Sequence, residues 1–127
     1  MKNLFARVVL PIGVVVLCAT AQADTRIMEV WICTLNDGHT MEEVKSGNTE
    51  WLAYIRKSVP GGDVQSYVTT PVVGALGNFL YVDSYPSMQA WTAAKEALNK
   101  EEGLALEAML NELATCESNT LYRREES

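Results

Sequence analysis

The sequence contains one histidine and few basic residues for its length. Ten lysines and arginines stand against sixteen aspartates and glutamates among 127 residues. A single histidine cannot supply a multi-histidine metal site, and no acidic run has EF-hand spacing, so no metal ion is expected. An acidic surface repels phosphate backbones, and no basic patch interleaves with aromatic residues. Nucleic acid is therefore not an expected partner, and the charge is typical of a soluble small protein.

The sequence also lacks an apolar run long enough to cross a membrane. The apolar run at residues 8–17 has about half of the ~20 residues that a membrane-spanning helix needs. Lys2 and Arg7 precede this run, and residues 21–23 (Ala-Gln-Ala) follow it as a small-x-small cleavage site. This pattern predicts a secretory signal peptide at residues 1–23, and hence a periplasmic or secreted protein that is not membrane-attached after cleavage. An uncleaved anchor is the alternative.

Cysteine is scarce, and only Cys33 and Cys116 lie outside the predicted signal peptide. A lipid anchor on Cys18 is disfavoured, because that signal needs a small residue before the cysteine and Leu17 is not small. An even number of cysteines in an exported chain favours a Cys33–Cys116 disulfide. The alternatives are two free thiols or a reactive Cys33 beside His39, although no CxxC spacing indicates redox chemistry.

Residues 24–127 have the length of one domain, and without Lys2 and Arg7 their net charge is about −8. Segments 27–35 and 79–85 are apolar on both faces, with Glu29 and Asp83 as the main exceptions. A one-sided sheet would show polar residues on alternate positions, so both segments are predicted to be central strands. Two further strands, each with more polar residues, are predicted at 64–73 and 120–124. A hairpin loop is predicted at 74–78.

Each predicted central strand leads into a helical segment. Thr40 and Glu43 form a capping box at the start of the first helix, in which Gly47 is a weak point. Ser87 is the predicted N-cap of the second helical region, which Gly103 breaks or kinks. Cys116 is predicted to lie near the last turn of this region. The aliphatic stem of Lys95 is predicted to cover part of the apolar stripe of the same region.

The resulting order is β-α-β-β-α-β, which predicts an α+β fold with a ferredoxin-like four-stranded antiparallel sheet. Its two helical regions cover one face only. The other face, with Met28, Val30 and Ile32 or the opposite set, would expose more apolar area than a soluble monomer usually tolerates. A homodimer in which two copies pack face to face is the simplest expected assembly.

The turn into the first helix, Leu35-Asn36-Asp37-Gly38-His39-Thr40-Met41-Glu42-Glu43-Val44, resembles the dimeric α+β barrel superfamily. The order of the elements and the two strands that are apolar on both faces also resemble this superfamily. The superfamily includes antibiotic-biosynthesis-type monooxygenases and haem-degrading relatives, and the resemblance implies pairing as a dimeric α+β barrel. The haem-degrading members use a histidine on the second long helix, where this sequence has none. No cofactor is expected.

Polar residues on apolar faces are the candidate site residues. Asn48 either binds a ligand between helix and sheet or ties down nearby backbone, because an unpartnered buried amide costs ~1–3 kcal/mol. Asp83 lies between two tyrosines, where it either acts as a base with a raised pKa or pairs with a basic residue at the dimer seam. His39 is either a general base or pocket rim near Asp37, or an exposed turn residue.

Three hypotheses for function follow from these residues. The first is an exported protein that binds a small apolar or aromatic ligand through Asn48, Trp51, Tyr81 and Tyr85. The alternative is a cofactor-independent monooxygenase or isomerase in which His39 and Asp83 are catalytic. A purely structural dimer is the third, since aromatic residues at these spacings are often plain core. The sequence does not decide whether the protein is an enzyme.

Overall fold

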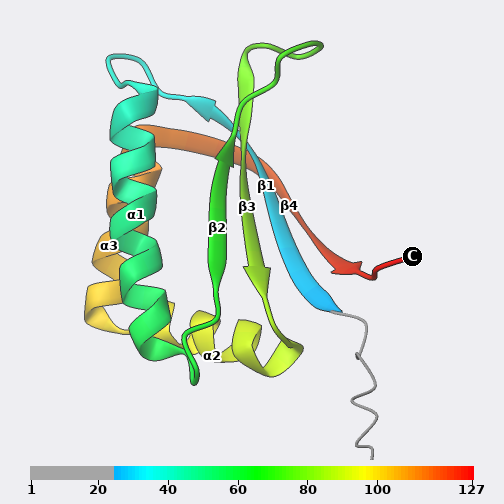
Figure 1. Cartoon of the computed structure of the whole chain (residues 1–127). Helices are drawn as coiled ribbons and strands as arrows, with labels where there is room; N and C mark the ends of the chain where they lie inside the picture. The colour runs from blue at the N-terminus through cyan, green and yellow to red at the C-terminus, as the bar shows by residue number, and fades with distance from the viewer. Residues whose placement is uncertain (1–24) are drawn as a thin grey trace, which may run out of the picture.

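The computed structural model describes residues 25–127, and the predicted signal peptide lies outside them. In chain order the elements are β1 (Arg26–Leu35), α1 (Met41–Ser58), β2 (Gln65–Thr69), β3 (Asn78–Tyr85), α2 (Met88–Leu98), α3 (Glu101–Leu113) and β4 (Ala114–Arg124). The strands form one antiparallel sheet in the order β2-β3-β1-β4, and the helices lie on one side of it (Figure 1). The predicted ferredoxin-like α+β fold is confirmed. No helix in this range is long and apolar enough to cross a membrane.

Helix α1 begins where the sequence predicts it. The Thr40 hydroxyl accepts a hydrogen bond from the Glu43 backbone N–H, and the Glu43 carboxylate accepts one from the Thr40 N–H. Gly47, expected only to weaken this helix, is buried where α1 approaches α3. A Cβ at this position would lie 2.9 Å from Met109 Sδ and 3.1 Å from Leu110 Cδ2, so glycine permits the close packing of the two helices.

The second helical region is interrupted as predicted, but at Asn99 and Lys100 rather than at Gly103. Gly103 lies within the first turn of α3 and is buried. A Cβ there would lie 2.5 Å from both the Ala97 carbonyl oxygen and Leu98 Cα. Backbone atoms cannot move aside as a flexible side chain does, so Gly103 is required by the tight corner between α2 and α3.

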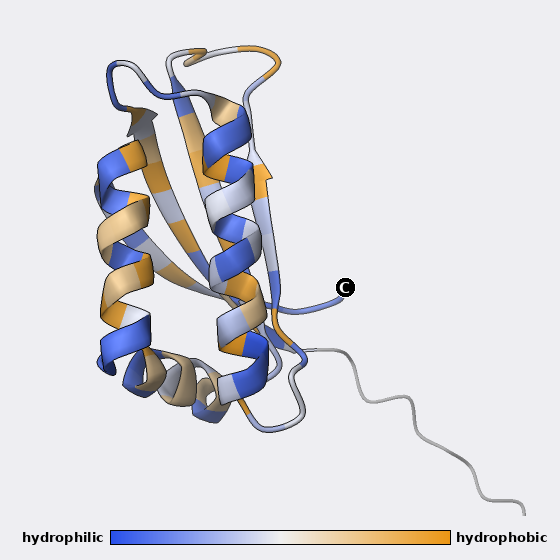
Figure 2. Ribbon diagram, turned by 90° about the vertical axis from the view of Figure 1, so that its left-hand side faces the viewer, coloured by the Kyte–Doolittle hydropathy of each residue, from blue (hydrophilic) through white to orange (hydrophobic). Residues whose placement is uncertain are grey.

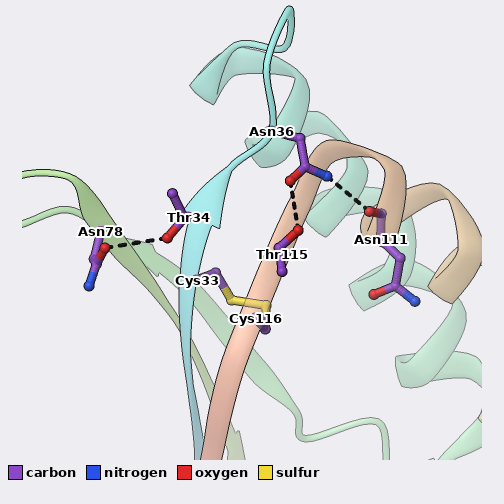
Figure 3. The surroundings of a disulfide bond; sticks show 7 residues. All are labelled: Cys33, Thr34, Asn36, Asn78, Asn111, Thr115 and Cys116. Atoms are coloured by element: carbon purple, nitrogen blue, oxygen red, sulfur yellow. Dashed lines mark hydrogen bonds between the residues drawn. A yellow bond between two sulfur atoms is a disulfide. The ribbon is translucent and has the colours of Figure 1, made fainter.

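The last strand is longer than predicted. It begins at Ala114 rather than at residue 120, so Cys116 lies in a strand and not in the last turn of a helix. Asn36, the residue after β1, caps the end of α3. Its Nδ2 donates to the carbonyl oxygen of Asn111 at 3.1 Å (Figure 3). It also donates to that of Glu112 at 2.9 Å, and a helix end otherwise leaves such carbonyl groups unsatisfied. Strand β2 is shorter than predicted, ending at Thr69.

Strands β1 and β4 are joined by a disulfide between Cys33 and Cys116, which confirms the predicted bond (Figure 3). The two residues are direct cross-strand partners, with a Cα–Cα distance of 3.9 Å. Beyond them the register shifts, because Ile32 pairs with Ser118 and leaves Glu117 as an extra residue. This bulge changes the alternation of β4, so that Asn119 shares the helix-covered face with its cross-strand partner Trp31.

The face of the sheet away from the helices carries a group of apolar side chains, and no element of residues 25–127 covers it (Figure 1). The side chains of Ile32, Tyr67 and Tyr122 are 40%, 52% and 53% exposed, respectively. The apolar and aromatic residues of this face, which we call the outer face, are Met28, Val30, Ile32, Tyr67, Leu80, Val82 and Tyr122. The central strands are therefore covered on one face only within a single chain.

Candidate functional site

A cavity of about 250 Å³ lies between the helices and the sheet. Figure 2 shows this side of the molecule, with α1 and α3 in front of the strands. The cavity wall consists of Trp31, Asn48, Trp51, Tyr81, Asp83, Lys95, Leu98, Glu107, Leu110, Asn111 and Cys116. Four of the six residues predicted as catalytic or ligand-binding, namely Asn48, Trp51, Tyr81 and Asp83, therefore line one cavity. His39 and Tyr85 do not.

Helical and strand spacing explain why these residues meet. Asn48 and Trp51 are three residues apart on α1, so they face the sheet one above the other. Tyr81 and Asp83 are two residues apart on β3, so both point to the helix-covered face. Trp31 is the direct cross-strand partner of Tyr81 and adds a further aromatic ring to the same wall.

A chain of hydrogen bonds connects three elements at the polar end of the cavity. Asn48 Nδ2 donates to Ser66 Oγ over 3.0 Å, and the Ser66 hydroxyl donates to Asp83 Oδ1 over 2.5 Å. Asn48 is thus partnered by a side chain of β2 rather than by nearby backbone. Ser66 was not predicted as a site residue, because a serine in a polar edge strand gives no signal of its own.

Asp83 is a buried acid whose proton affinity is changed by its surroundings. Its side chain is only 4% exposed. Burial raises the pKa of Asp83 from 3.8 to about 7, and the negative charge of Glu29 adds to this effect. The hydrogen bond from Ser66 and the positive charge of Lys95 act in the opposite direction. A carboxyl group with a pKa near 7 exchanges protons readily at neutral pH.

Two tyrosine hydroxyls near Asp83 have no hydrogen-bond partner within the described residues. Tyr81 lines the cavity, and burial together with the charge of Asp83 raises the pKa of this tyrosine to about 12. It therefore remains a proton donor at neutral pH. Tyr85 is fully buried in the apolar core beside α1 and α2, where burial also raises its pKa. Of the two, only the hydroxyl of Tyr81 belongs to a residue of the cavity wall.

Glu29 is a second buried carboxylate, only 1% exposed, that sequence reasoning did not select. It is the cross-strand partner of Asp83 on β1 and β3. Lys95 Nζ lies 2.8 Å from Glu29 Oε2, an ion pair that the sequence did not predict. Glu29 was detectable, because it interrupts its apolar strand just as Asp83 interrupts the other.

His39 lies outside the cavity, at the start of α1. Its Nδ1 is 3.6 Å from the carboxylate of Glu43. The hydrogen bond from the Thr40 backbone is the main reason that the pKa of Glu43 is lowered, and His39 adds to it. Among residues 25–127, no three histidine, cysteine, aspartate or glutamate side chains gather in a way that could hold a metal ion.

No protein-family model matches the sequence, and no curated protein matches it significantly. Among solved structures, SnoaB, a cofactor-independent oxygenase from Streptomyces nogalater, aligns with a TM-score of 0.60 and 16% identity. The alignment covers 80% of this chain and 95% of SnoaB. The chain has the fold of the antibiotic-biosynthesis-monooxygenase-like proteins. The resemblance to the dimeric α+β barrel superfamily is thereby confirmed at the level of the fold.

Two further solved structures have a similar fold. A candidate antibiotic biosynthesis monooxygenase from Nitrosomonas europaea aligns with a TM-score of 0.55 and 11% identity, over 83% of this chain and 92% of that one. A dimeric ferredoxin-like protein of unknown function from Thermobifida fusca aligns with a TM-score of 0.51 and 13% identity, over 80% and 92% of the two chains.

Proposed function

We propose that the cavity binds a small aromatic or enolisable molecule and that Asp83 accepts a proton from it. The observation that carries this proposal is the position of Asp83, a base with a pKa of about 7 in the wall of a cavity with three aromatic residues. Trp31, Trp51 and Tyr81 offer ring faces and edges to a planar molecule. Asp83 then meets an acidic O–H or C–H of that molecule at the polar end.

The neighbours of Asp83 have separate roles in this proposal. Asn48 and Ser66 fix the orientation of the carboxyl group through their hydrogen bonds. The Tyr81 hydroxyl, which has no partner within residues 25–127, donates to the oxygen on which negative charge develops as the proton leaves. His39 has no role, because it does not line the cavity.

Proton removal is the first step of two reactions that need no cofactor. In an isomerase, Asp83 returns the proton to a different atom of the same molecule. In an oxygenase, molecular oxygen oxidises a methylene group to a carbonyl group, and its second oxygen atom leaves as water. SnoaB is described as a cofactor-independent oxygenase, which supports the second reaction by analogy of fold alone.

The test uses 2-naphthol as an aromatic, enolisable probe. Tryptophan fluorescence measures its binding, and NMR in deuterated water measures exchange of its ring proton next to the hydroxyl-bearing carbon. We expect the wild-type protein to bind the probe and to catalyse exchange, and Asp83→Asn to lower the exchange rate about 100-fold. Tyr67→Phe, on the outer face, is the matched control for Tyr81→Phe, which should slow exchange.

The outcomes of this experiment separate the two functions predicted from the sequence. Binding with Asp83-dependent exchange supports proton transfer. Binding without exchange contradicts the role of Asp83 and leaves a protein that only binds its ligand. Absence of binding, with the variants and the wild-type protein equally folded, contradicts the ligand site itself.

We further propose that the protein is an exported homodimer that packs through its outer face. The disulfide supports an oxidising compartment, and the predicted signal peptide supports a periplasmic or secreted location. The Thermobifida fusca protein of the same fold is described as dimeric. We expect the processed chain to sediment as a dimer at micromolar concentration and Val30→Glu to sediment as a monomer, because the charge would be buried in the interface. A folded, soluble wild-type monomer would contradict this assembly.

A further inference from the structure

We infer that Glu29 determines which ligands the cavity accepts. By holding the ammonium group of Lys95, it makes the cavity accept uncharged aromatic molecules and exclude carboxylates. The inference rests on the ligand site proposed above and specifies the charge of its ligand. Glu29 is not in the cavity wall, so it acts as a positioning residue through Lys95.

The carboxylate of Glu29 is hydrogen-bonded from two elements of the fold. Its Oε2 accepts from Lys95 Nζ at 2.8 Å and from Trp91 Nε1 at 3.2 Å, both on α2. Its Oε1 accepts from Asn119 Nδ2 on β4 at 3.0 Å, an arrangement that depends on the bulge at Glu117. A buried carboxylate with three donors is well compensated and forms a stable anchor for a cation.

Lys95 is the one basic residue in the cavity wall. Besides its ion pair with Glu29, its ammonium group lies 5.5 Å from the ring centre of Trp31 and 5.8 Å from that of Trp91. Both rings attract a cation at this distance. The Lys95 ammonium group therefore already interacts with the Glu29 carboxylate and two aromatic rings when no ligand is bound.

The remaining charges in the cavity are negative. Glu107 from α3 and Asp83 from β3 lie in the wall, together with the neutral hydroxyl of Tyr81. The uncharged Asn48 of α1 also lies in the wall, and its partner Ser66 lies behind it. Once Lys95 and Glu29 compensate each other, a ligand carboxylate meets one or two like charges and no free cation, which disfavours its binding. An uncharged hydroxyl group meets the Tyr81 donor and the Asp83 carboxyl group instead.

The test compares 2-naphthol with 2-naphthoate, which have the same ring system and differ in charge. We expect the wild-type protein to bind 2-naphthol at least about 10-fold more tightly than 2-naphthoate. Glu29→Gln releases Lys95, so 2-naphthoate affinity should rise about 10-fold while 2-naphthol affinity changes less than about 3-fold. Adding Lys95→Met to this variant should remove the gain, and Glu117→Gln on the exposed bulge is the matched control with no gain.

A gain of affinity cannot come from a variant that fails to fold, and near-ultraviolet circular dichroism checks each protein. Glu29→Asp is the second variant, because it keeps a buried carboxylate but withdraws it from Lys95, and it should give a smaller gain of the same sign. If 2-naphthol binds but neither variant gains affinity for 2-naphthoate, the role of Glu29 is wrong while the ligand site stands. If the wild-type protein binds neither molecule, the ligand site fails and this inference fails with it.

Discussion

Replacing Asp83 with asparagine is expected to stabilise the protein at about pH 8 and to flatten the pH dependence of its unfolding. Burial raises the pKa of Asp83 from 3.8 to about 7, so the folded state keeps a proton that the unfolded state releases near pH 4. The folded state binds more protons between these two values, and stability therefore falls as pH rises through this window. A shift of about three pH units corresponds to at most about 4 kcal/mol.

Denaturant unfolding of the wild-type and Asp83→Asn proteins at about pH 5 and about pH 8 measures this effect. Asparagine has nearly the same shape and still offers an oxygen to the Ser66 hydroxyl. We expect the difference in unfolding free energy between the two pH values to shrink in this variant. Asp37→Asn, in the exposed turn before α1, is the control and should behave like wild type. Equal pH dependence in all three proteins would contradict a raised pKa at Asp83.

Removal of the disulfide is expected to cause a large loss of stability. Cys33 and Cys116 are 83 residues apart in sequence, and a loop of this length corresponds to about 4–5 kcal/mol in the chain-entropy description. The bond also joins β1 to β4, the strand that carries Asn119 to Glu29. Loss of the bond should therefore weaken the support of the cavity as well as the fold.

The free energy of unfolding of a Cys33→Ala/Cys116→Ala double variant tests this expectation. Alanine avoids both a free thiol and a buried hydroxyl group in place of Cys33, which is fully buried. The wild-type protein unfolded in the presence of reductant provides an independent measurement of the same loss. A change below about 1 kcal/mol in both experiments would show that the bond contributes little to stability.

The fold was predictable from the sequence because its signals are local. The two strands that are apolar on both faces became the central strands, and the capping box at Thr40 and Glu43 became the start of α1. Asn48 and Asp83 were selected because each places a polar group on an apolar face. The structure places both in one cavity, joined through Ser66.

The features that the sequence did not predict depend on contacts between segments that are distant in sequence. Glu107 and Asn111 look like ordinary polar residues until α3 brings them to the cavity, and Ser66 does so until β2 brings it to Asp83. The start of β4 at Ala114 was missed because the cap that ends α3 comes from Asn36, far back in the chain. Gly103 was misinterpreted for the same reason, since the backbone that it avoids belongs to the end of α2.

The most direct test of the proposed base is a carbon-13 NMR titration of its side-chain carboxyl group. The chain has only four aspartates, at positions 24, 37, 63 and 83, so Asp83→Asn assigns the signal by its loss. The proposal predicts a titration midpoint at about 7 for Asp83 and a change of that midpoint when 2-naphthol is bound. A midpoint near 4, the ordinary value for an aspartate, and no response to 2-naphthol would contradict it.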